Sequence, residues 1–88
     1  MKIKRYGKHY VYILQCSDNT YYTGYTPKIK RRVKLHNAGK GAKYTRTRLP
    51  AKLVWYKKYK YFKKAFLEEI RIKKLPRARK EKLINDDK

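Results

Sequence analysis

The stretch HYVYILQCSDNTYYTG, residues 9–24, carries the clearest local signals of secondary structure in the chain. Residues 9–16 are rich in β-branched and aromatic side chains, which favour a β-strand. Ser17, Asp18 and Asn19 are residue types that form turns, and residues 20–24 again favour a strand. The sequence therefore predicts a β-hairpin over residues 9–24.

Three helices and a third strand are expected after this hairpin. Thr26 and Pro27 predict a helix start, with a hydroxyl N-cap followed by proline, and Gly39 predicts the C-cap of that helix. A basic loop over residues 39–48 leads to a strand over residues 51–58, and helical patterns follow over residues 62–74 and from Pro76 to about residue 84. The order ββαβαα predicts a single α/β (α+β) domain over residues 1–88, with a small three-stranded sheet flanked by helices.

The composition points to a folded protein with a polyanionic partner. There are 27 Lys plus Arg against 6 Asp plus Glu, a net charge of +21, and a phosphate backbone is the commonest polyanion to balance such a charge. The aromatic content of 15% favours a folded domain over a basic tail. Since no long apolar run marks a signal peptide or membrane span, a cytoplasmic protein is expected, with the nucleoid as one location. The single Cys16 excludes an internal disulfide.

Four residues of the first predicted helix share one stripe, at the spacing i, i+3, i+4 and i+7: Ile29, Arg32, Val33 and His36. Arg32 and His36 are therefore expected to face inward beside apolar residues. The other cations of this helix are expected to stay in water: Lys28, Lys30, Arg31 and Lys34. A phosphate-binding arginine and an arginine whose aliphatic stem packs while its head stays in water both fit this pattern.

The helix predicted over residues 62–74 places one carboxylate in an apolar sector. That sector is expected to contain Phe62, Phe66, Leu67 and Ile70, extended by Ala65 and Ile72. At about 100° per residue, Glu69 falls within it and Glu68 falls on the solvent side. A carboxylate in an apolar stripe needs a cation or a metal as its partner. Lys73 at i+4 would give an ion pair of about 0.3–0.5 kcal/mol, and Mg²⁺, which binds one or two carboxylates with waters and substrate phosphates, is the alternative.

Cations interleave with aromatic residues in two further segments, residues 40–48 and 55–61. This pattern suits contact with a phosphate backbone together with base stacking. An ordinary strand edge whose lysines prevent aggregation explains residues 55–61 equally well. The candidate nucleic-acid contacts are Lys28, Arg31, Lys40, Lys43, Arg46 and Arg48. No pattern gives His9 or Cys16 a chemical role.

In combination, these residues resemble the GIY-YIG nuclease family. Tyr10-Val11-Tyr12 and Tyr22-Thr23-Gly24 are similar to the two halves of its motif, with both tyrosines and the final glycine retained. Arg32 and His36 follow at the family's spacing, and Glu69 lies in EEIRIKKL, where the family carries its metal-binding glutamate. The segments GKGAKYTR and IKKLPRARKEKLI resemble short bacterial stand-alone members, so the resemblance covers nearly the whole chain. Tyr10, Val11 and Thr23 depart from the motif, and Leu75-Pro76 replaces a Ser or Thr helix cap.

The resemblance implies a three-stranded antiparallel sheet and hydrolysis of DNA phosphodiesters with Mg²⁺ or Mn²⁺. Tyr12 and Tyr22 would be the two motif tyrosines, with Tyr22 preferred as the group that takes the proton from water. Arg32 would stabilise the phosphoryl charge, Glu69 would hold the metal, and His36 would tune a tyrosine or position water. With no evident specificity domain, such an enzyme would be unselective, read DNA structure or be recruited by a partner protein.

Two other functions fit the sequence. A basic nucleic-acid-binding module without catalysis explains the charge and the interleaved aromatics. A basic protein within a ribonucleoprotein or on an anionic membrane explains the charge alone, and it has no use for Glu69 in an apolar stripe. Metal-dependent cleavage of DNA or RNA separates the enzyme from both alternatives.

Overall fold

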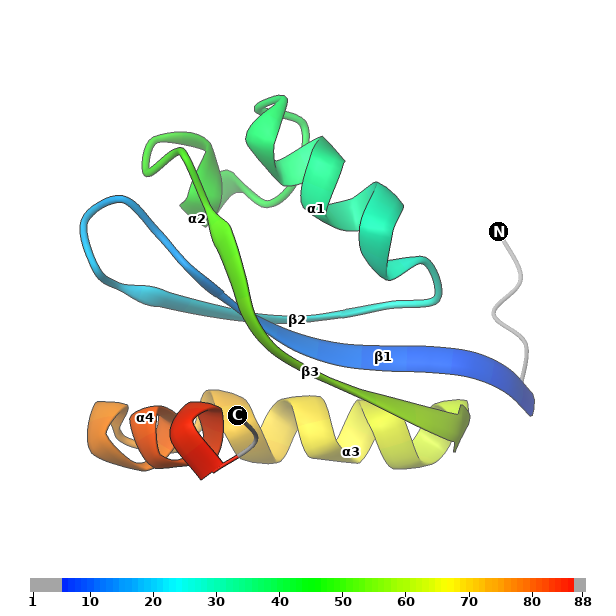
Figure 1. Cartoon of the computed structure of the whole chain (residues 1–88). Helices are drawn as coiled ribbons and strands as arrows, with labels where there is room; N and C mark the ends of the chain where they lie inside the picture. The colour runs from blue at the N-terminus through cyan, green and yellow to red at the C-terminus, as the bar shows by residue number, and fades with distance from the viewer. Residues whose placement is uncertain (1–5, 87–88) are drawn as a thin grey trace.

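Helices cover both faces of a three-stranded sheet in the computed structural model, which describes residues 6–86 (Figure 1). The strands are β1, Tyr6–Gln15; β2, Tyr21–Thr26; and β3, Lys52–Tyr61. The helices are α1, Ile29–Asn37; α2, Lys43–Arg46; α3, Phe62–Lys73; and α4, Arg77–Asp86. Both β2 and β3 pair antiparallel with β1, which is the central strand of the order β2-β1-β3. The expected three-stranded antiparallel sheet with helices is confirmed.

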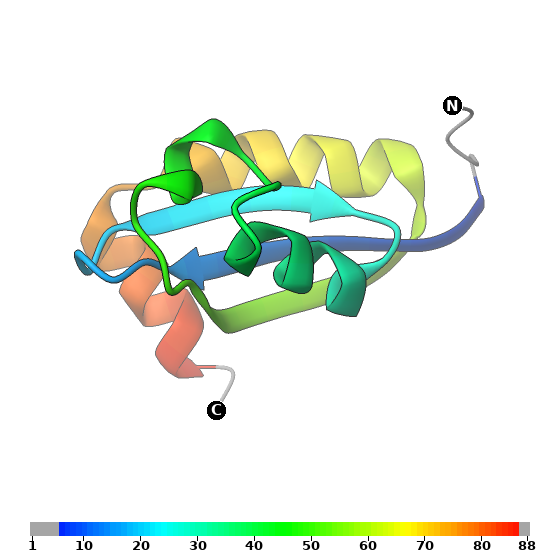
Figure 2. The ribbon, with the colours of Figure 1, turned by 90° about the horizontal axis from the view of Figure 1, so that it is seen from above.

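The central strand divides the core into two clusters because successive side chains of a strand point to opposite faces. Val11 and Ile13 are buried with Ala65 and Ile72 of α3. Tyr12 and Leu14 are buried on the other face, where residues of α1 pack against them. Figure 1 shows α1 and α2 on that face and α3 and α4 on the opposite one. Seen from above, α3 extends along the β2 side of the sheet (Figure 2).

The predicted hairpin is confirmed, and both of its strands are longer than expected. β2 continues two residues past Gly24 to Thr26, and Tyr12 pairs with Gly24 across the ladder. β3 continues past Lys58 to Tyr61, where the lysine-rich sequence had suggested an end. Pairing with the long central strand accounts for this extension, since Tyr59 lies opposite His9 and is buried.

The predicted start of the first helix is wrong by two residues. The N-cap of α1 is Lys28, which makes no side-chain capping bond. The hydroxyl of Thr26 accepts the N–H of Lys28 at 3.1 Å, so it stabilises the turn between β2 and α1 instead of the helix. At the other end, Gly39 lies one residue beyond the C-cap and has a φ of 76°, which glycine adopts without strain.

The segment predicted as a loop over residues 39–48 contains a short helix, α2. The observed order is therefore ββααβαα. With four residues, α2 is about one helical turn. A segment of that length cannot show the periodicity by which helices are recognised in a sequence.

Only part of the apolar sector predicted on α3 packs on the sheet. Ala65 and Ile72 are fully buried, whereas Phe66, Leu67 and Ile70 are 45%, 55% and 37% exposed. Ala65 and Ile72 belong to the core cluster that contains Val11 and Ile13, whereas the three larger apolar side chains are exposed. Glu68, expected in solvent, is half-buried and accepts a hydrogen bond from Arg71 at 2.8 Å.

Candidate active site

A buried hydrogen bond joins the first motif tyrosine to the histidine of α1. The hydroxyl of Tyr12 lies 2.8 Å from Nε2 of His36, and both residues are about 1% exposed. The predicted stripe on α1 explains this contact, because Ile29 and Val33 pack in the Tyr12 cluster and bring His36 inward with them. The structure thus unites two predicted residues that lie 24 positions apart.

Two glycines make room for this pair. A Cβ atom on Gly24 would lie 2.5 Å from the Tyr12 hydroxyl oxygen and 2.6 Å from Cζ. A Cβ atom on Gly41 would collide with Nδ1 of His36 and lie 2.6 Å from its Cγ. The absence of a side chain at Gly24 allows a close approach. The atom that approaches is the hydroxyl of Tyr12.

Tyr22 lies beside the buried pair on the same face of the sheet. Its ring centroid is 5.3 Å from that of His36 and 6.4 Å from that of Tyr12. On its other side it stacks with Tyr44 of α2, at 6.1 Å and an interplanar angle of 23°. Tyr22 is half-buried, so its hydroxyl is easier to reach from solvent than that of Tyr12.

The electrostatic setting keeps both members of the buried pair neutral. Burial raises the pKa of Tyr12 well above its usual value, and the neighbouring Tyr22 adds to the shift. Arg32 opposes this shift of the Tyr12 pKa, and Glu69 adds to it, so both charges act on the same hydroxyl. Burial lowers the pKa of His36, and the positive charge of Arg32 lowers it further.

Arg32 and Glu69 belong to opposite helical layers, because α1 and α3 cover opposite faces of the sheet (Figure 1). The side chain of Glu69 is 18% exposed and pairs with Lys73 at 3.1 Å, which is the ion pair considered from the sequence. Lys73 is 51% exposed, so displacing it would cost little. Among residues 6–86, no three His, Cys, Asp or Glu side chains cluster as a metal site. An ion at Glu69 would therefore need waters and substrate phosphates to complete its coordination, which suits Mg²⁺.

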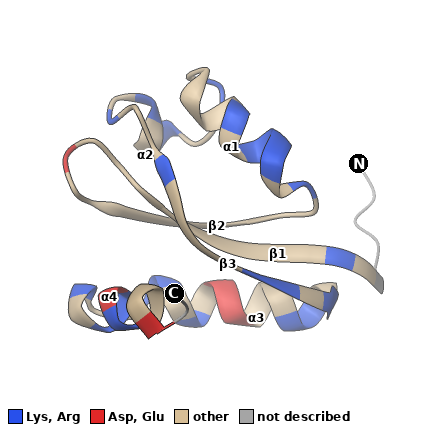
Figure 3. Ribbon diagram, viewed as in Figure 1, with Lys and Arg blue, Asp and Glu red and all other residues tan. Residues whose placement is uncertain are grey.

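Most of the predicted nucleic-acid contacts are exposed cations on the α1 and α2 side of the molecule. These are Lys28, Arg31, Lys40, Lys43 and Arg46. Figure 3 shows further Lys and Arg residues on β3, α3 and α4, so both helical layers are basic. Within residues 6–86, none of the helices has the length and apolar character needed to cross a bilayer.

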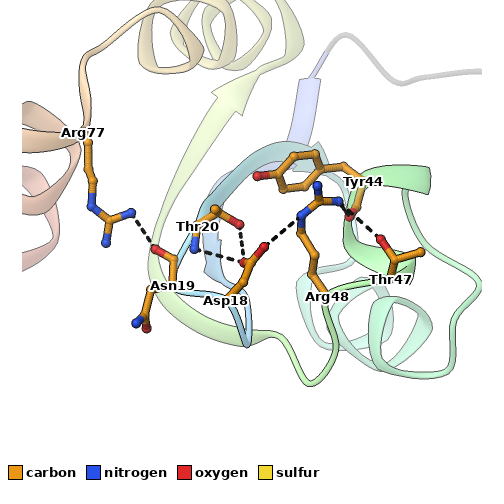
Figure 4. Close-up of polar contacts among 7 residues, drawn as sticks. All are labelled: Asp18, Asn19, Thr20, Tyr44, Thr47, Arg48 and Arg77. Atoms are coloured by element: carbon orange, nitrogen blue, oxygen red, sulfur yellow. Dashed lines mark hydrogen bonds and ion pairs between the residues drawn. The ribbon is translucent and has the colours of Figure 1, made fainter.

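Arg48, the sixth predicted contact, is bound within the protein. Its Nε donates to Asp18 at 3.0 Å, and its guanidinium lies 4.0 Å from the ring centre of Tyr44. From the other helical layer, Arg77 donates to the carbonyl of Asn19 at 2.5 Å. Figure 4 shows the hairpin turn held between these two arginines. Arg48 thus supports the hairpin turn and the ring of Tyr44.

Sequence reasoning missed the contribution of α2. The hydroxyl of Thr45, which is fully buried, lies 2.8 Å from Nδ1 of His36, and Tyr44 stacks on Tyr22. The sequence alone gives no signal for either contact, because α2 has no detectable period. His9 was also missed, since it is 2% exposed and its Nδ1 lies 2.7 Å from the hydroxyl of Tyr25.

Comparison with known proteins identifies relatives over most of the chain. The model of the GIY-YIG catalytic domain matches residues 8–82. A UPF0213 protein from Natronomonas pharaonis is 51% identical over 79 residues, covering 90% of this chain and 93% of the relative. One from Oceanobacillus iheyensis is 52% identical over 77 residues, covering 88% of this chain and 90% of the relative.

Solved structures show the same fold. The solution NMR structure of a UPF0213 protein from Bacillus halodurans has a TM-score of 0.60 and 47% identity, covering 90% of this chain and 84% of that one. That of a protein from E. faecalis has a TM-score of 0.63 and 36% identity, covering 96% of this chain and 90% of that one.

Proposed function

Because this chain belongs to the GIY-YIG catalytic domain family, we propose that it is an endonuclease that hydrolyses DNA phosphodiester bonds with Mg²⁺ or Mn²⁺. The observation that carries this proposal is that four other predicted site residues act on one buried hydroxyl, that of Tyr12. Tyr12 is bonded to His36, flanked by Tyr22, and subject to the charges of both Arg32 and Glu69.

The two tyrosines have different roles in this proposal. Tyr12 is buried, its hydroxyl is bonded to His36, and its pKa is raised, so it is poorly suited to accept a proton from water. Tyr22 is half-buried beside it, and its phenolate form would take the proton of the water that attacks phosphorus. The rings of Tyr12 and His36 pack against the ring of Tyr22 and hold it in position.

Charge stabilisation is divided between the helical layers. The guanidinium of Arg32 stabilises the charge on the transferring phosphoryl group, for which its planar fork of donors is suited. Glu69 would hold the divalent ion, which when bound supplies Lewis acidity at the leaving oxygen. Glu69 pairs with the exposed Lys73 at 3.1 Å, and a bound divalent ion would compete with this ion pair.

Cleavage assays on matched variants test the proposal. Tyr22→Phe, Arg32→Ala and Glu69→Gln should each abolish metal-dependent cleavage without unfolding the protein. Glu81→Gln is the matched carboxylate control, since Glu81 is an exposed residue of α4 that pairs with Arg77 at 3.9 Å. Arg31→Ala removes the exposed neighbour of Arg32 and should raise KM in a salt-dependent way with little change in kcat. Full cleavage by Glu69→Gln would refute the metal assignment.

A non-catalytic nucleic-acid-binding module is the second candidate, favoured by basic residues on both helical layers (Figure 3). The substrate panel consists of supercoiled, linear, branched and single-stranded DNA, and RNA, each with Mg²⁺, Mn²⁺ or EDTA. Salt-sensitive binding to these substrates without cleavage in either metal would establish the module and refute the enzyme. An enzyme of this type would act in DNA repair or recombination, in the cytoplasm or at the nucleoid, with a partner protein or DNA structure directing it.

A further inference from the structure

Thr45 continues the hydrogen bonds of the buried pair into α2. The Tyr12 hydroxyl lies 2.8 Å from Nε2 of His36, and Nδ1 of His36 lies 2.8 Å from Oγ1 of Thr45. The Thr45 hydroxyl in turn donates to the carbonyl of Ala42 at 3.0 Å. The three side chains of this path are at most 1% exposed.

The chemistry of the end groups decides which atoms carry protons. A carbonyl oxygen only accepts, so the single hydroxyl proton of Thr45 is directed at Ala42. The Thr45 oxygen then accepts from His36, which places a proton on Nδ1 and leaves a lone pair on Nε2. That lone pair accepts the phenolic proton of Tyr12.

The opposite arrangement leaves a buried proton without an acceptor. If Thr45 donated to Nδ1, then Nε2 would carry the proton and donate to the oxygen of Tyr12. The phenolic proton of Tyr12 would then point into a buried environment without His36 as its acceptor, which is costly. The one gain would be the N–H of Ala42, which lies 3.4 Å from Nδ1, a long contact compared with the other three.

We propose that Thr45 is a positioning residue that holds His36 as the Nδ1–H tautomer, so that His36 accepts the proton of Tyr12 and leaves the Tyr12 oxygen free to accept a hydrogen bond in the site. Gly41 makes this contact accessible, since a side chain there would occupy the space of His36 Nδ1. Thr45 therefore acts on the reaction through His36 without touching substrate. The tautomer is inferred from the hydrogen-bond contacts of His36 and Thr45, whereas its effect on cleavage rests on the proposed function.

The tautomer can be measured directly on the ¹⁵N-labelled protein by long-range ¹H–¹⁵N correlation spectra. The chain has 2 histidines, and a His36→Gln spectrum assigns the signals. We expect a protonated-type shift for Nδ1 and a lone-pair-type shift for Nε2 of His36. Thr45→Ser keeps the hydroxyl and should keep this pattern, and Thr45→Val should shift it toward the other tautomer. Thr47→Val is the matched control, since Thr47 is exposed and lies two residues on.

Cleavage kinetics supply the second measurement. Thr45→Val should lower kcat about tenfold, the factor that corresponds to one hydrogen bond, with KM unchanged and with kcat restored in Thr45→Ser. An Nε2–H tautomer in the native protein would overturn the proposal even if Thr45→Val failed to fold. An unchanged tautomer in folded Thr45→Val would also overturn it. If the tautomer shifts as expected and no variant or native protein cleaves DNA or RNA, then the positioning role stands and the endonuclease proposal fails.

Discussion

Replacing Gly24 by alanine should destabilise the protein through one contact, that with the ring of Tyr12. The added Cβ would lie 2.5 Å from the hydroxyl oxygen and 2.6 Å from Cζ, whereas ordinary contacts begin at 3.4 Å. Tyr12 would have to move by roughly 1 Å, and its 2.8 Å bond to His36 would be broken or strained. Overpacking costs about 1–3 kcal/mol, and an unsatisfied buried polar group costs about 1–3 kcal/mol. Because partial relaxation relieves both, we expect a loss of about 2–5 kcal/mol in unfolding free energy.

Urea denaturation followed by circular dichroism measures this loss, and a double-mutant cycle identifies its cause. In a Tyr12→Leu background, the atoms that the new Cβ would meet are absent, so Gly24→Ala should cost less than about 1 kcal/mol there. Gly24 is not among the glycines with positive φ, so backbone strain does not contribute. An equal cost in both backgrounds, or a cost below about 0.5 kcal/mol in the native background, would refute the reasoning.

Three further predictions concern other parts of the fold. Asn37→Ala should lower the unfolding free energy by about 1–3 kcal/mol, because the Asn37 amide accepts from the N–H of Ala51 at 2.7 Å and donates to its carbonyl at 2.9 Å; an unchanged urea midpoint would contradict this. Ile72→Ala should lower the unfolding free energy by about 2–5 kcal/mol and Ile70→Ala by less than half as much, since Ile72 is fully buried and Ile70 is 37% exposed. Equal losses of unfolding free energy would mean that Ile70 packs as the sequence predicted. Hydrogen bonds from Thr20, and then the charge of Arg48, lower the pKa of Asp18. The stability from this carboxylate is complete above its unfolded pKa of about 3.9 and is lost as pH falls through the lower folded value. The Asp18→Asn variant should therefore lose less unfolding free energy than the native protein between about pH 4 and pH 2 in acid denaturation. Parallel plots of unfolding free energy against pH for the two proteins would disprove the effect.

The parts of the fold that the sequence predicted are those where spacing determines packing. The hairpin followed from residue type, and the stripe of α1 placed His36 inside and Lys34 outside because the helical period requires it. The sector of α3 was predicted only in part, because helical spacing alone did not show which of its apolar residues are buried. The small Ala65 is fully buried, whereas Phe66 is 45% exposed. The hydroxyl of Thr26 was assigned to a helix end, although it serves the preceding turn equally well.

The sequence predicted several residues of the candidate site, but it did not predict all of the contacts among them. Family spacing selected Tyr12 and His36, and the structure shows them bonded. Thr45 and Gly41 could not be selected, because their contacts with His36 depend on the path of a short segment with no period. Thr45 and Gly41 come close to His36 only in the packed tertiary structure, which local sequence patterns do not describe.

The two arginines that hold the hairpin turn have a consequence for the kinetics of folding. The hairpin is local, but its turn is bonded to residues 30 and 58 positions away in the sequence, Arg48 and Arg77. Contacts of such long range form after the local ones, so we expect them to be absent from the folding transition state. Arg77→Ala should then accelerate unfolding and leave the folding rate nearly unchanged. The contacts of the turn with the two arginines would then determine the lifetime of the native state, through the unfolding rate, more than the folding rate.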